Sequence, residues 1–371
     1  MNGKAMRHLG ASAAAVFVSA IVVSSFAAGP ARTMLGEAHS YHVSFLTSDG
    51  FVEAPQHDAN LVNAWGLTAT STSPWWVADN GTGLSTLYDG NGVPQSLVVT
   101  VPGNPTGAVA GAGAGFIVND GTNSGPARFL FASEDGTISG WNPGVPPPSP
   151  SHQAFVVVDS SPAGTVYKGL AIASTGAGDR LYATDFHNGR VDVFDGSFAP
   201  VVRMGAFVDP RIPTGFAPFG IRAIGGRIFV TYAKQDADQH DDVAGQGIGF
   251  VSVFDTEGTF IARVGTRGQL NSPWGIALAP TDFGRFGGDL LIGNFGDGNI
   301  LAYRMTDDMR RFTPAGQLRD QGGRIISIEG LWAISFGNGA AAGGTNQLFF
   351  TAGSDHEAHG SFGRIDVAGA P

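Results

Sequence analysis

The chain contains no cysteine, and only 14% of its 371 residues are charged. The absence of cysteine excludes disulfides, thiolate metal ligands and a cysteine nucleophile. The 21 Lys and Arg residues form no basic run and are outnumbered by 31 Asp and Glu, which gives a formal net charge of −10. Because nucleic-acid binding requires basic side chains that neutralise phosphates, we expect no nucleic-acid partner.

Glycine and proline are abundant, with 56 and 21 residues. They are the poorest helix formers, so a protein of long helices is excluded, and the glycines lack the strict three-residue repeat of collagen. A hydrophobic content of 43% argues against a disordered chain. The composition therefore predicts an all-β protein with many tight turns.

The N-terminus has the pattern of an export signal. Lys4 and Arg7 precede an apolar run that ends at Phe26, and small residues follow. We expect residues 1–27 to be a signal peptide that is cleaved before Ala28. The alternative is that the apolar run stays in place as a membrane anchor.

Cleavage would leave a short N-terminal extension over residues 28–40 and a folded domain over residues 41–371. No later segment is long and apolar enough to span a membrane. We therefore expect a secreted or periplasmic protein with no membrane span after cleavage.

A glycine followed by an apolar residue recurs about every fifty residues. The pairs are Gly66-Leu67, Gly115-Phe116, Gly169-Leu170, Gly220-Ile221, Gly275-Ile276 and Gly330-Leu331. Each pair is followed by a short apolar run, such as Leu181–Ala183, and then in most units by an alternating run that ends in an aromatic, such as Val191–Phe194. Turn residues and a weaker fourth strand follow in most units. Four strands repeated six times predict a single six-bladed β-propeller.

The last unit is one strand short, and the segment His42–Leu46 precedes the first unit without belonging to it. We predict that this segment completes the last blade and closes the ring. The alternative is seven blades or an open array. The stretches Pro143–Pro150 and Gly107–Gly115 are expected to be flexible connections within the one domain.

Three blade openings carry a shared phrase. Asn63-Ala64-Trp65-Gly66-Leu67, Ala217-Pro218-Phe219-Gly220-Ile221 and Ser272-Pro273-Trp274-Gly275-Ile276 resemble the blade openings of NHL-type propellers. With the long phrases Tyr232–Gly245 and Thr351–Gly363, the chain resembles a family of exported bacterial propeller proteins without an assigned activity. The resemblance implies export and the propeller, and it implies no chemistry.

Polar residues cluster in the loops between the second and third strands of the units. These loops lie on the same face as the start of each first strand, so their side chains should surround the mouth of the central channel. The candidate ligand-binding residues are Asp79, Glu134, Lys168, Asp185, Lys234 and Asn294. The alternative for Asp79, Asp185 and Asn294 is that each only caps its own turn, and Lys234 could simply neutralise the acidic loop beside it.

A second set of residues has the chemistry of metal ligands. It comprises His187, Asp236, Asp238, His240, Asp242, Asp355, His356, Glu357 and His359. An EF-hand over Asp236–Gly247 is excluded because Asp241 stands where glycine is required and Gly247 where the bidentate Glu belongs. His356 and His359 are three residues apart, not four, which excludes the helical zinc motif.

Two kinds of site remain open for these residues. Several carboxylates could hold Ca²⁺, or His187, His240 and one of His356 and His359 could meet as three ligands of Zn²⁺. The alternative is a solvated acidic loop over residues 234–242 with surface histidines.

The aromatic residues beside the blade-opening glycines also allow two interpretations. Trp65, Phe219, Trp274 and Trp332 could stack on a flat ligand, or they could pack between blades.

Two functions fit these features. The first is an exported binding propeller that holds a small molecule, a cation or an extracytoplasmic protein partner at the channel mouth. The second is a metal-dependent hydrolase or lyase that uses a divalent metal, calcium or zinc, at the same mouth. The sequence lacks a Gly-x-Ser-x-Gly elbow and shows no complete catalytic constellation, which favours the first.

Overall fold

The computed structural model describes residues 40–111 and 113–369. The expected signal peptide and nearly all of the expected extension therefore lie outside the described residues. In the described chain, no helix is long and apolar enough to cross a membrane. The helical pieces found there are two short 3₁₀ turns, Ser161–Ala163 and Gly284–Phe286, and the rest of the secondary structure is β.

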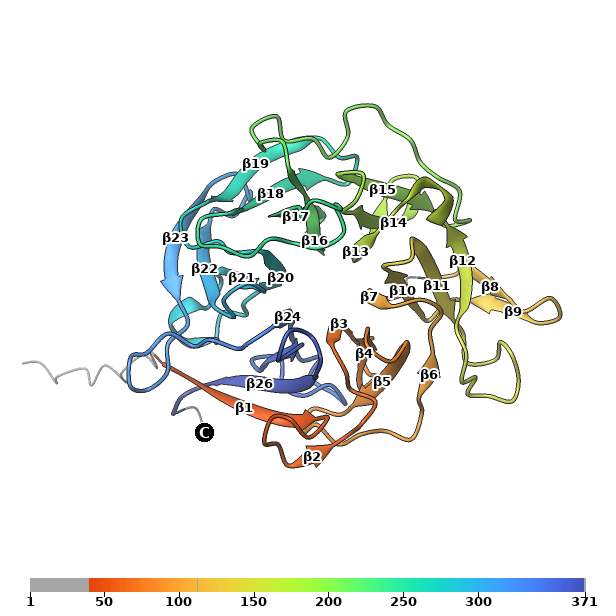
Figure 1. Cartoon of the computed structure of the whole chain (residues 1–371), viewed down its shortest axis with the longest axis horizontal. Helices are drawn as coiled ribbons and strands as arrows, with labels where there is room; N and C mark the ends of the chain where they lie inside the picture. Colours follow the sequence, from red (N-terminus) through yellow and green to blue (C-terminus); the bar gives the residue numbers. More distant parts are fainter. Residues whose placement is uncertain (1–39, 112, 370–371) are drawn as a thin grey trace, which may run out of the picture. The chain divides into compact units, whose positions relative to one another are not determined.

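Six sheets surround a central axis as the blades of a propeller (Figure 1). Blade one comprises β3 (Ala64–Thr68), β4 (Trp75–Asp79), β5 (Leu84–Tyr88) and β6 (Val99–Thr100). Blade two comprises β7 (Pro105–Ala110), β10 (Phe129–Ser133), β11 (Thr137–Trp141) and β12 (Phe155–Asp159), with the small hairpin of β8 (Ile117–Asn119) and β9 (Ser124–Pro126) inserted between its first two strands. Blade three comprises β13 (Tyr167–Thr175), β14 (Gly178–Asp185) and β15 (Arg190–Asp195).

The other three blades follow in chain order. Blade four comprises β16 (Phe216–Ile224), β17 (Arg227–Lys234), β18 (Gly249–Asp255) and β19 (Phe260–Thr266). Blade five comprises β20 (Pro273–Leu278), β21 (Leu290–Asn294), β22 (Ile300–Met305) and β23 (Phe312–Gln317). Blade six comprises β24 (Leu331–Phe336), β25 (Leu348–Ala352) and β26 (Ser361–Val367), to which β1 (Tyr41–Ser48) and β2 (Gln56–His57) are added. The six-bladed prediction is confirmed.

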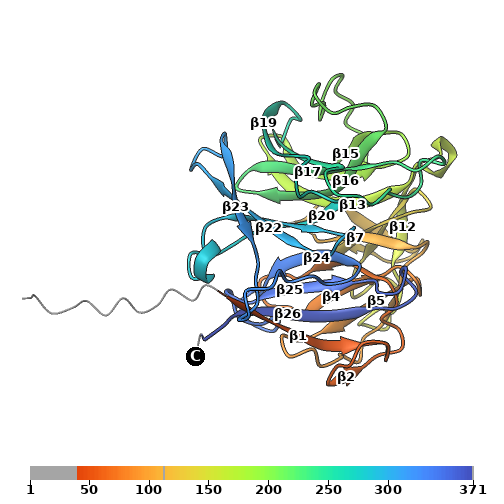
Figure 2. The same ribbon diagram turned by 60° about the vertical axis from the view of Figure 1, so that its left-hand side comes forward.

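The N-terminal strand closes the ring, as predicted. β1 pairs antiparallel with β26, from Tyr41 opposite Val367 to Ser48 opposite Ser361. Figure 2 shows these two strands side by side at the outside of blade six. The pairing joins the two ends of the propeller, so the ring has no open end between its last blade and its first.

The first strands of neighbouring blades approach so closely that only small residues fit between them. A Cβ on Gly66 would lie 2.4 Å from the carbonyl oxygen of Thr106, and one on Gly220 would lie 2.1 Å from that of Trp274. Each such glycine abuts the equivalent small residue of the next blade. The positions, in order around the axis, are Gly66, Gly107, Gly169, Gly220, Gly275 and Ala333.

This register corrects two of the six repeat positions read from the sequence. Blade two uses Gly107 in β7 rather than Gly115, which precedes β8, and blade six uses Ala333 rather than Gly330. The expected flexible connection Gly107–Gly115 therefore begins inside a strand. Its small residues are typical of a linker, but they are also what a first strand needs at the crowded axis.

Threonine hydroxyls link neighbouring blades near the axis. Thr106 Oγ1 donates to the carbonyl of Tyr167 at 2.8 Å, and Thr184 Oγ1 donates to that of Phe219 at 2.7 Å. Thr351 Oγ1 donates to the carbonyl of Trp65 at 2.6 Å, which joins blade six to blade one. These bonds satisfy carbonyls on first strands, whose inner edges have no strand partner.

Blade three lacks the outer strand that completes the other blades. The chain after β15 pairs with it only briefly, where Val201 N donates to the carbonyl of Val193 at 2.7 Å, and then leaves. A groove of about 940 Å³ fills the outer position, between β12, β15 and the segment 198–207. Val202 and Met204 in that segment are 91% and 99% exposed.

The crowding at the axis predicts that an added side chain there destabilises the protein. We expect Gly220→Ala to lower the free energy of unfolding by about 1–3 kcal/mol, because its Cβ would overlap backbone that cannot move aside cheaply. Gly176→Ala is the matched control, since nothing lies within 4 Å of its added Cβ. Urea unfolding measures both variants, and equal unfolding midpoints for the two would contradict the close-approach argument.

Candidate functional site

An aromatic layer closes the channel near the mouth. The residue before the small axial position is Trp65, Phe219, Trp274 or Trp332 in four of the blades. The rings of Trp65 and Trp332 stack with centroids 3.6 Å apart, and Phe295 stacks on the other side of Trp332 at 3.9 Å. Trp65, Phe219 and Trp332 are each 1% exposed. These rings therefore pack on one another and do not stand open to a ligand.

Lys168 takes the place of an aromatic residue in blade three. It precedes Gly169 in β13, is 1% exposed, and holds its Nζ 5.1 Å from the ring centroid of Trp65. The ammonium forms ion pairs with Glu134 and with Asp241, the latter at 3.0 Å. Burial opposes the charge on Lys168, but the two carboxylates outweigh this effect and raise the pKa of its ammonium. Lys168 is therefore a fixed cation and not a nucleophile at neutral pH.

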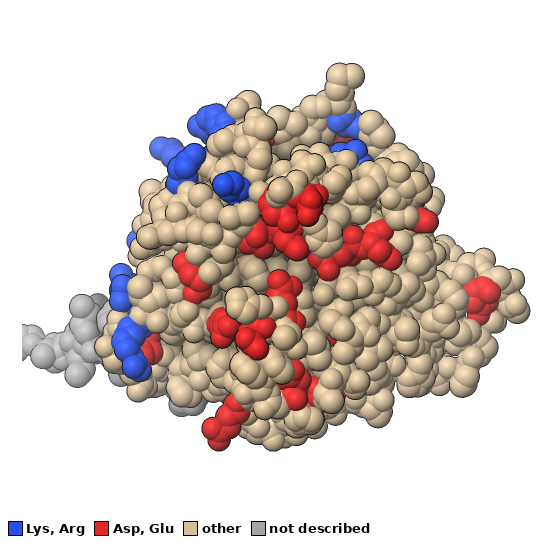
Figure 3. Space-filling model, viewed as in Figure 1, with Lys and Arg blue, Asp and Glu red and all other residues tan. Residues whose placement is uncertain are grey.

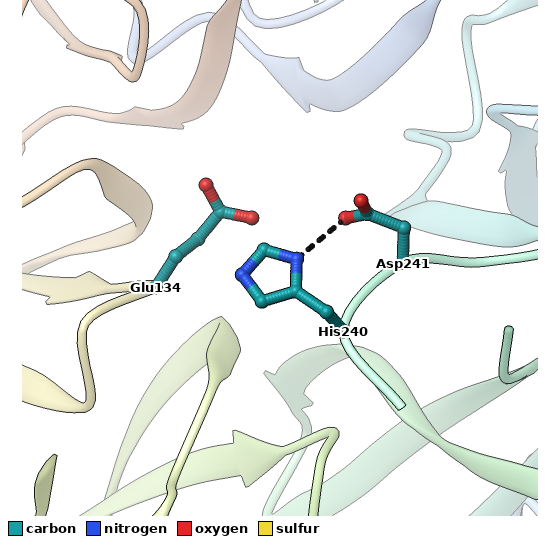
Figure 4. A group of neighbouring side chains, drawn as sticks. All are labelled: Glu134, His240 and Asp241. Atoms are coloured by element: carbon teal, nitrogen blue, oxygen red, sulfur yellow. Dashed lines mark hydrogen bonds and ion pairs between the residues drawn. The ribbon is translucent and has the colours of Figure 1, made fainter. Parts of the chain in front are cut away.

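Two carboxylates and an imidazole meet at the mouth (Figure 4). Both carboxylates also pair with Lys168. Glu134 comes from the loop after β10, and His240 and Asp241 come from the long loop between β17 and β18. His240 Nδ1 lies 3.0 Å from Asp241 Oδ1, and one ligand atom from each of the three residues lies within 4.8 Å of the others. Across residues 40–111 and 113–369, no other group of three His, Asp or Glu side chains comes this close.

A chain of amide side chains connects this group to blades one and six. Asn80 Nδ2 donates to Glu134 Oε2 at 2.8 Å, and Asn63 Nδ2 donates to Asn80 Oδ1 at 3.1 Å. Asn63 Nδ2 also donates to Glu357 Oε2 at 2.7 Å, and Asn63 Oδ1 accepts from Trp332 Nε1 at 2.9 Å. The network orients Glu134 and Glu357 and ties them to the aromatic layer below.

The backbone that carries Glu357 is strained. Asp355, His356 and Glu357 have φ angles of 50°, 54° and 69°, which is the left-handed region that non-glycine residues seldom occupy. Asn63 also has a positive φ, of 46°, and asparagine is among the residues that accept this conformation most readily. Such strain concentrates at ligand sites, where the surrounding structure holds it in place.

Carboxylates outnumber cations at the mouth. Burial raises the pKa of Glu357, and burial raises the pKa of Asp242 to about 6. Burial also raises the pKa of Asp241, but the neighbouring Lys168 and His240 lower it by more, so the pKa of Asp241 is lowered overall. Figure 3 shows acidic side chains gathered around the centre of the face seen in Figure 1, with basic side chains at its rim.

Three of the candidate ligand-binding residues hold their own turns. The Asp79 carboxylate accepts bonds from the backbone N and the Oγ1 of Thr86, at 2.9 and 2.8 Å. Asp185 accepts from Asn188 Nδ2 at 2.7 Å, and Asn294 Nδ2 donates to Asp297 Oδ1 at 3.0 Å. These contacts are the ones expected if Asp79, Asp185 and Asn294 cap their own turns. Lys234, at the end of β17, is exposed.

The other three candidate histidines lie apart from the group. His359 Nδ1 lies 2.7 Å from Asp49 Oδ2, and its ring stacks on Phe51. His356 is exposed, and His187 is half-buried. In the described chain, none of the three joins His240 in a cluster with metal-ligand spacing.

The remaining acidic residues among the candidate metal ligands either hold their loop in place or are exposed on it. Asp236 Oδ1 accepts a bond from the backbone N of His240 at 2.9 Å, so this carboxylate holds the loop that presents His240. Asp238 and Asp355 are exposed. The carboxylates of the long loop therefore do not converge as an EF-hand's would.

Sequence reasoning missed Asn63 and Asp241 as site residues. Asp241 was visible only as the residue that breaks the EF-hand pattern. The available signal for Asn63 was its place directly before a first strand, where an asparagine can adopt the left-handed conformation that starts the strand. Neither signal indicates the partner across the channel.

No family model matches the chain. Two curated viral proteins are similar to it along nearly its whole length. "Uncharacterized protein R648" of Acanthamoeba polyphaga mimivirus is 33% identical over 352 residues, which cover 91% of this chain and 82% of that protein. "Uncharacterized protein L690" of the same virus is 32% identical over 353 residues, which cover 91% of this chain and 87% of that protein.

A solved structure shares the fold. The soluble aldose sugar dehydrogenase of Escherichia coli, in its apo form, has a TM-score of 0.52 with 12% sequence identity, covering 88% of this chain and 99% of that one. At this identity the likeness shows the fold alone. The relatives named above are viral, whereas the blade-opening phrases resemble NHL-type bacterial propellers. From its identity and coverage, the chain belongs to the β-propeller family that includes the mimivirus proteins R648 and L690.

Proposed function

We propose that this chain is an exported binding propeller that holds a small, positively charged ligand at the acidic channel mouth. The observation that carries the proposal is the convergence of Glu134, Asp241, Asp242 and Glu357 around a single buried cation, Lys168. One ammonium cannot neutralise four carboxylates. The remaining negative charge would attract a cation to the mouth and hold it there.

The packed rings below the mouth favour a ligand that binds at the mouth over one that passes through the channel. The stacked rings of Trp65, Trp332 and Phe295 fill the channel, so a ligand at the mouth would rest above them. The bonds through Asn63 and Asn80 fix the carboxylates before a ligand arrives. A site that is already organised spends less of its binding energy on ordering side chains.

The proposal keeps the secreted or periplasmic location, on the strength of the export-signal pattern over residues 1–27. The NHL-type blade openings and the resemblance to exported bacterial propellers point the same way. A small molecule bound from the extracytoplasmic space is the partner that this site would take.

A second candidate is a metal-dependent hydrolase or lyase. One observation favours it, which is the spacing of Glu134, His240 and Asp241, since two carboxylates and an imidazole are a donor set that divalent metals accept. Lys168 stands against it, because its ammonium already lies on two of the three donors. Asp242 would be the base in such an enzyme, since its raised pKa brings it close to neutrality.

The binding proposal predicts that the protein binds a cationic small molecule. We expect isothermal titration calorimetry of the mature protein to show binding of putrescine, and we expect Glu134→Gln and Asp241→Asn each to weaken it at least tenfold. Asp238→Asn is the matched control, because it removes an exposed carboxylate from the same loop. A wild-type protein that binds no cationic probe, or site variants that match the control, would refute the binding proposal.

Zinc distinguishes the two candidate functions in the same assay. The metal candidate requires that zinc binds and that His240→Ala abolishes zinc binding. The amine candidate requires that putrescine binding survives His240→Ala, because the imidazole adds no negative charge. Loss of both ligands in His240→Ala would mean that the loop itself had been disturbed.

Lys168 provides the second prediction. Replacing it as Lys168→Met leaves Glu134 partly buried without its counter-ion, so we expect the free energy of unfolding to fall by about 3 kcal/mol. The same variant should bind zinc at least tenfold more tightly, because the competing ammonium is gone. Urea unfolding and calorimetry measure the two effects, and zinc affinity equal to that of the wild type would show that Lys168 does not oppose a metal.

The titration of Asp242 provides the third prediction. Burial raises its pKa in the folded state to about 6, above the value of 3.8 that applies when unfolded. The folded state therefore binds this proton more tightly, and the stability that the proton contributes is full below pH 4 and is lost as the pH rises through 6. We expect Asp242→Asn to stabilise the protein at pH 7.5 by about 1–3 kcal/mol and to have no effect at pH 4. Urea unfolding at both pH values checks this, with Asp238→Asn as the control, and a gain that persists unchanged at pH 4 would contradict it.

A further inference from the structure

Arg222 lies in the central channel on the far side of the aromatic layer from the acidic mouth. It follows Phe219 by three residues in β16, which places it about 10 Å further along the strand. It lines a cavity of about 30 Å³ together with residues from the first strands of all six blades. The cavity therefore lies on the axis of the propeller, at the level of the small residues and just beyond them.

The charge of Arg222 has no counter-ion in the described chain. Its guanidinium donates one hydrogen bond, from Nη2 to Ser335 Oγ at 3.0 Å, although a guanidinium carries five N–H donors. No carboxylate among residues 40–111 and 113–369 forms an ion pair with it. By contrast, Arg263 pairs with Asp209 and Arg364 with Asp366.

The rest of the cavity wall is apolar. Leu67, Leu170, Ile221, Ile276 and Ile334 line the cavity with Arg222. Arg222 is half-buried, and burial lowers the pKa of its guanidinium. An unpaired charge in apolar surroundings is costly, and the cost falls when an ion of opposite charge lies beside it.

The size of the cavity limits what that ion is. One water-sized occupant needs about 10–15 Å³, so a cavity of about 30 Å³ has room for a single-atom anion. The acidic mouth repels anions, and the aromatic layer blocks their passage. An anion would therefore reach Arg222 from the face opposite the mouth.

We propose that the central channel binds one monatomic anion, chloride under ordinary conditions, beside the guanidinium of Arg222, next to the contact that this guanidinium makes with the hydroxyl of Ser335. Arg222 belongs to β16 of blade four and Ser335 to β24 of blade six, so this contact joins two blades that are not neighbours in the ring. This site is independent of the cation site at the mouth, since the two share no residue and lie on opposite sides of the aromatic layer.

Bromide soaked into crystals of the wild-type protein tests the proposal directly. We expect an anomalous peak within hydrogen-bond distance of the Arg222 guanidinium. A channel that contains only water gives no such peak, and its absence at high bromide concentration would overturn the proposal without reference to any variant.

Anion-dependent stability provides the second measurement. At constant ionic strength, replacing gluconate with chloride should raise the unfolding midpoint of the wild type, because the anion binds only the folded state. Arg222→Met should lose this dependence, with chloride bound at least tenfold more weakly. Arg128→Met, the same substitution at an exposed arginine, should retain it.

Two further outcomes are decisive. If Arg222→Met does not fold, Ser335→Ala keeps the charge, removes the hydroxyl that holds the guanidinium, and should weaken chloride binding at least threefold. An equal response to chloride in the wild type and the Arg222 or Ser335 variant would overturn the site. Stabilisation by sulfate that also depends on Arg222 would overturn the single-atom fit.

Discussion

The close approach of the six first strands at the axis is the constraint on which the other features depend. It admits only glycine or alanine at one position in each blade, from Gly66 round to Ala333. Because side chains alternate along a strand, the residues on either side of this position project where the ring leaves room. The preceding residues form the aromatic layer with Lys168, and in blade four Arg222 stands two residues beyond the small position. The crowding of backbone at one level thus determines where large and charged side chains can stand at the next.

The aromatic layer also separates two electrostatic environments. Above it, carboxylates exceed the one ammonium that reaches among them, and the amides of Asn63 and Asn80 hold those carboxylates in fixed positions. Below it, a guanidinium stands among aliphatic side chains. The stacked indole rings of Trp65 and Trp332 stand between the two environments. On β16, Arg222 stands only three residues beyond Phe219 of the aromatic layer.

The fold followed from sequence because its signals are local and repeated. A short strand, a turn and a glycine recur within each unit, and the surplus strand at the start matched the missing strand at the end. The register of blade two was misread because Gly107 lies among small residues that resemble a linker. The mouth was predicted from its polar loops, which include Glu134 and His240. The partnership of Asn63 with Glu357 could not be predicted, because it depends on φ angles and on which blades face each other across the channel.

The pairing of β1 with β26 has a consequence for how the molecule forms. Tyr41 is among the first residues of the domain to be made, and its partner Val367 is among the last. Bringing together ends so distant in the chain costs about 5 kcal/mol of loop-closure entropy. The chain loses this entropy before the contacts between β1 and β26 can form. Until then, each finished blade exposes a face that only its neighbour can cover. Ring closure should therefore be the slow step of folding, and the half-assembled arc is the species most exposed to aggregation.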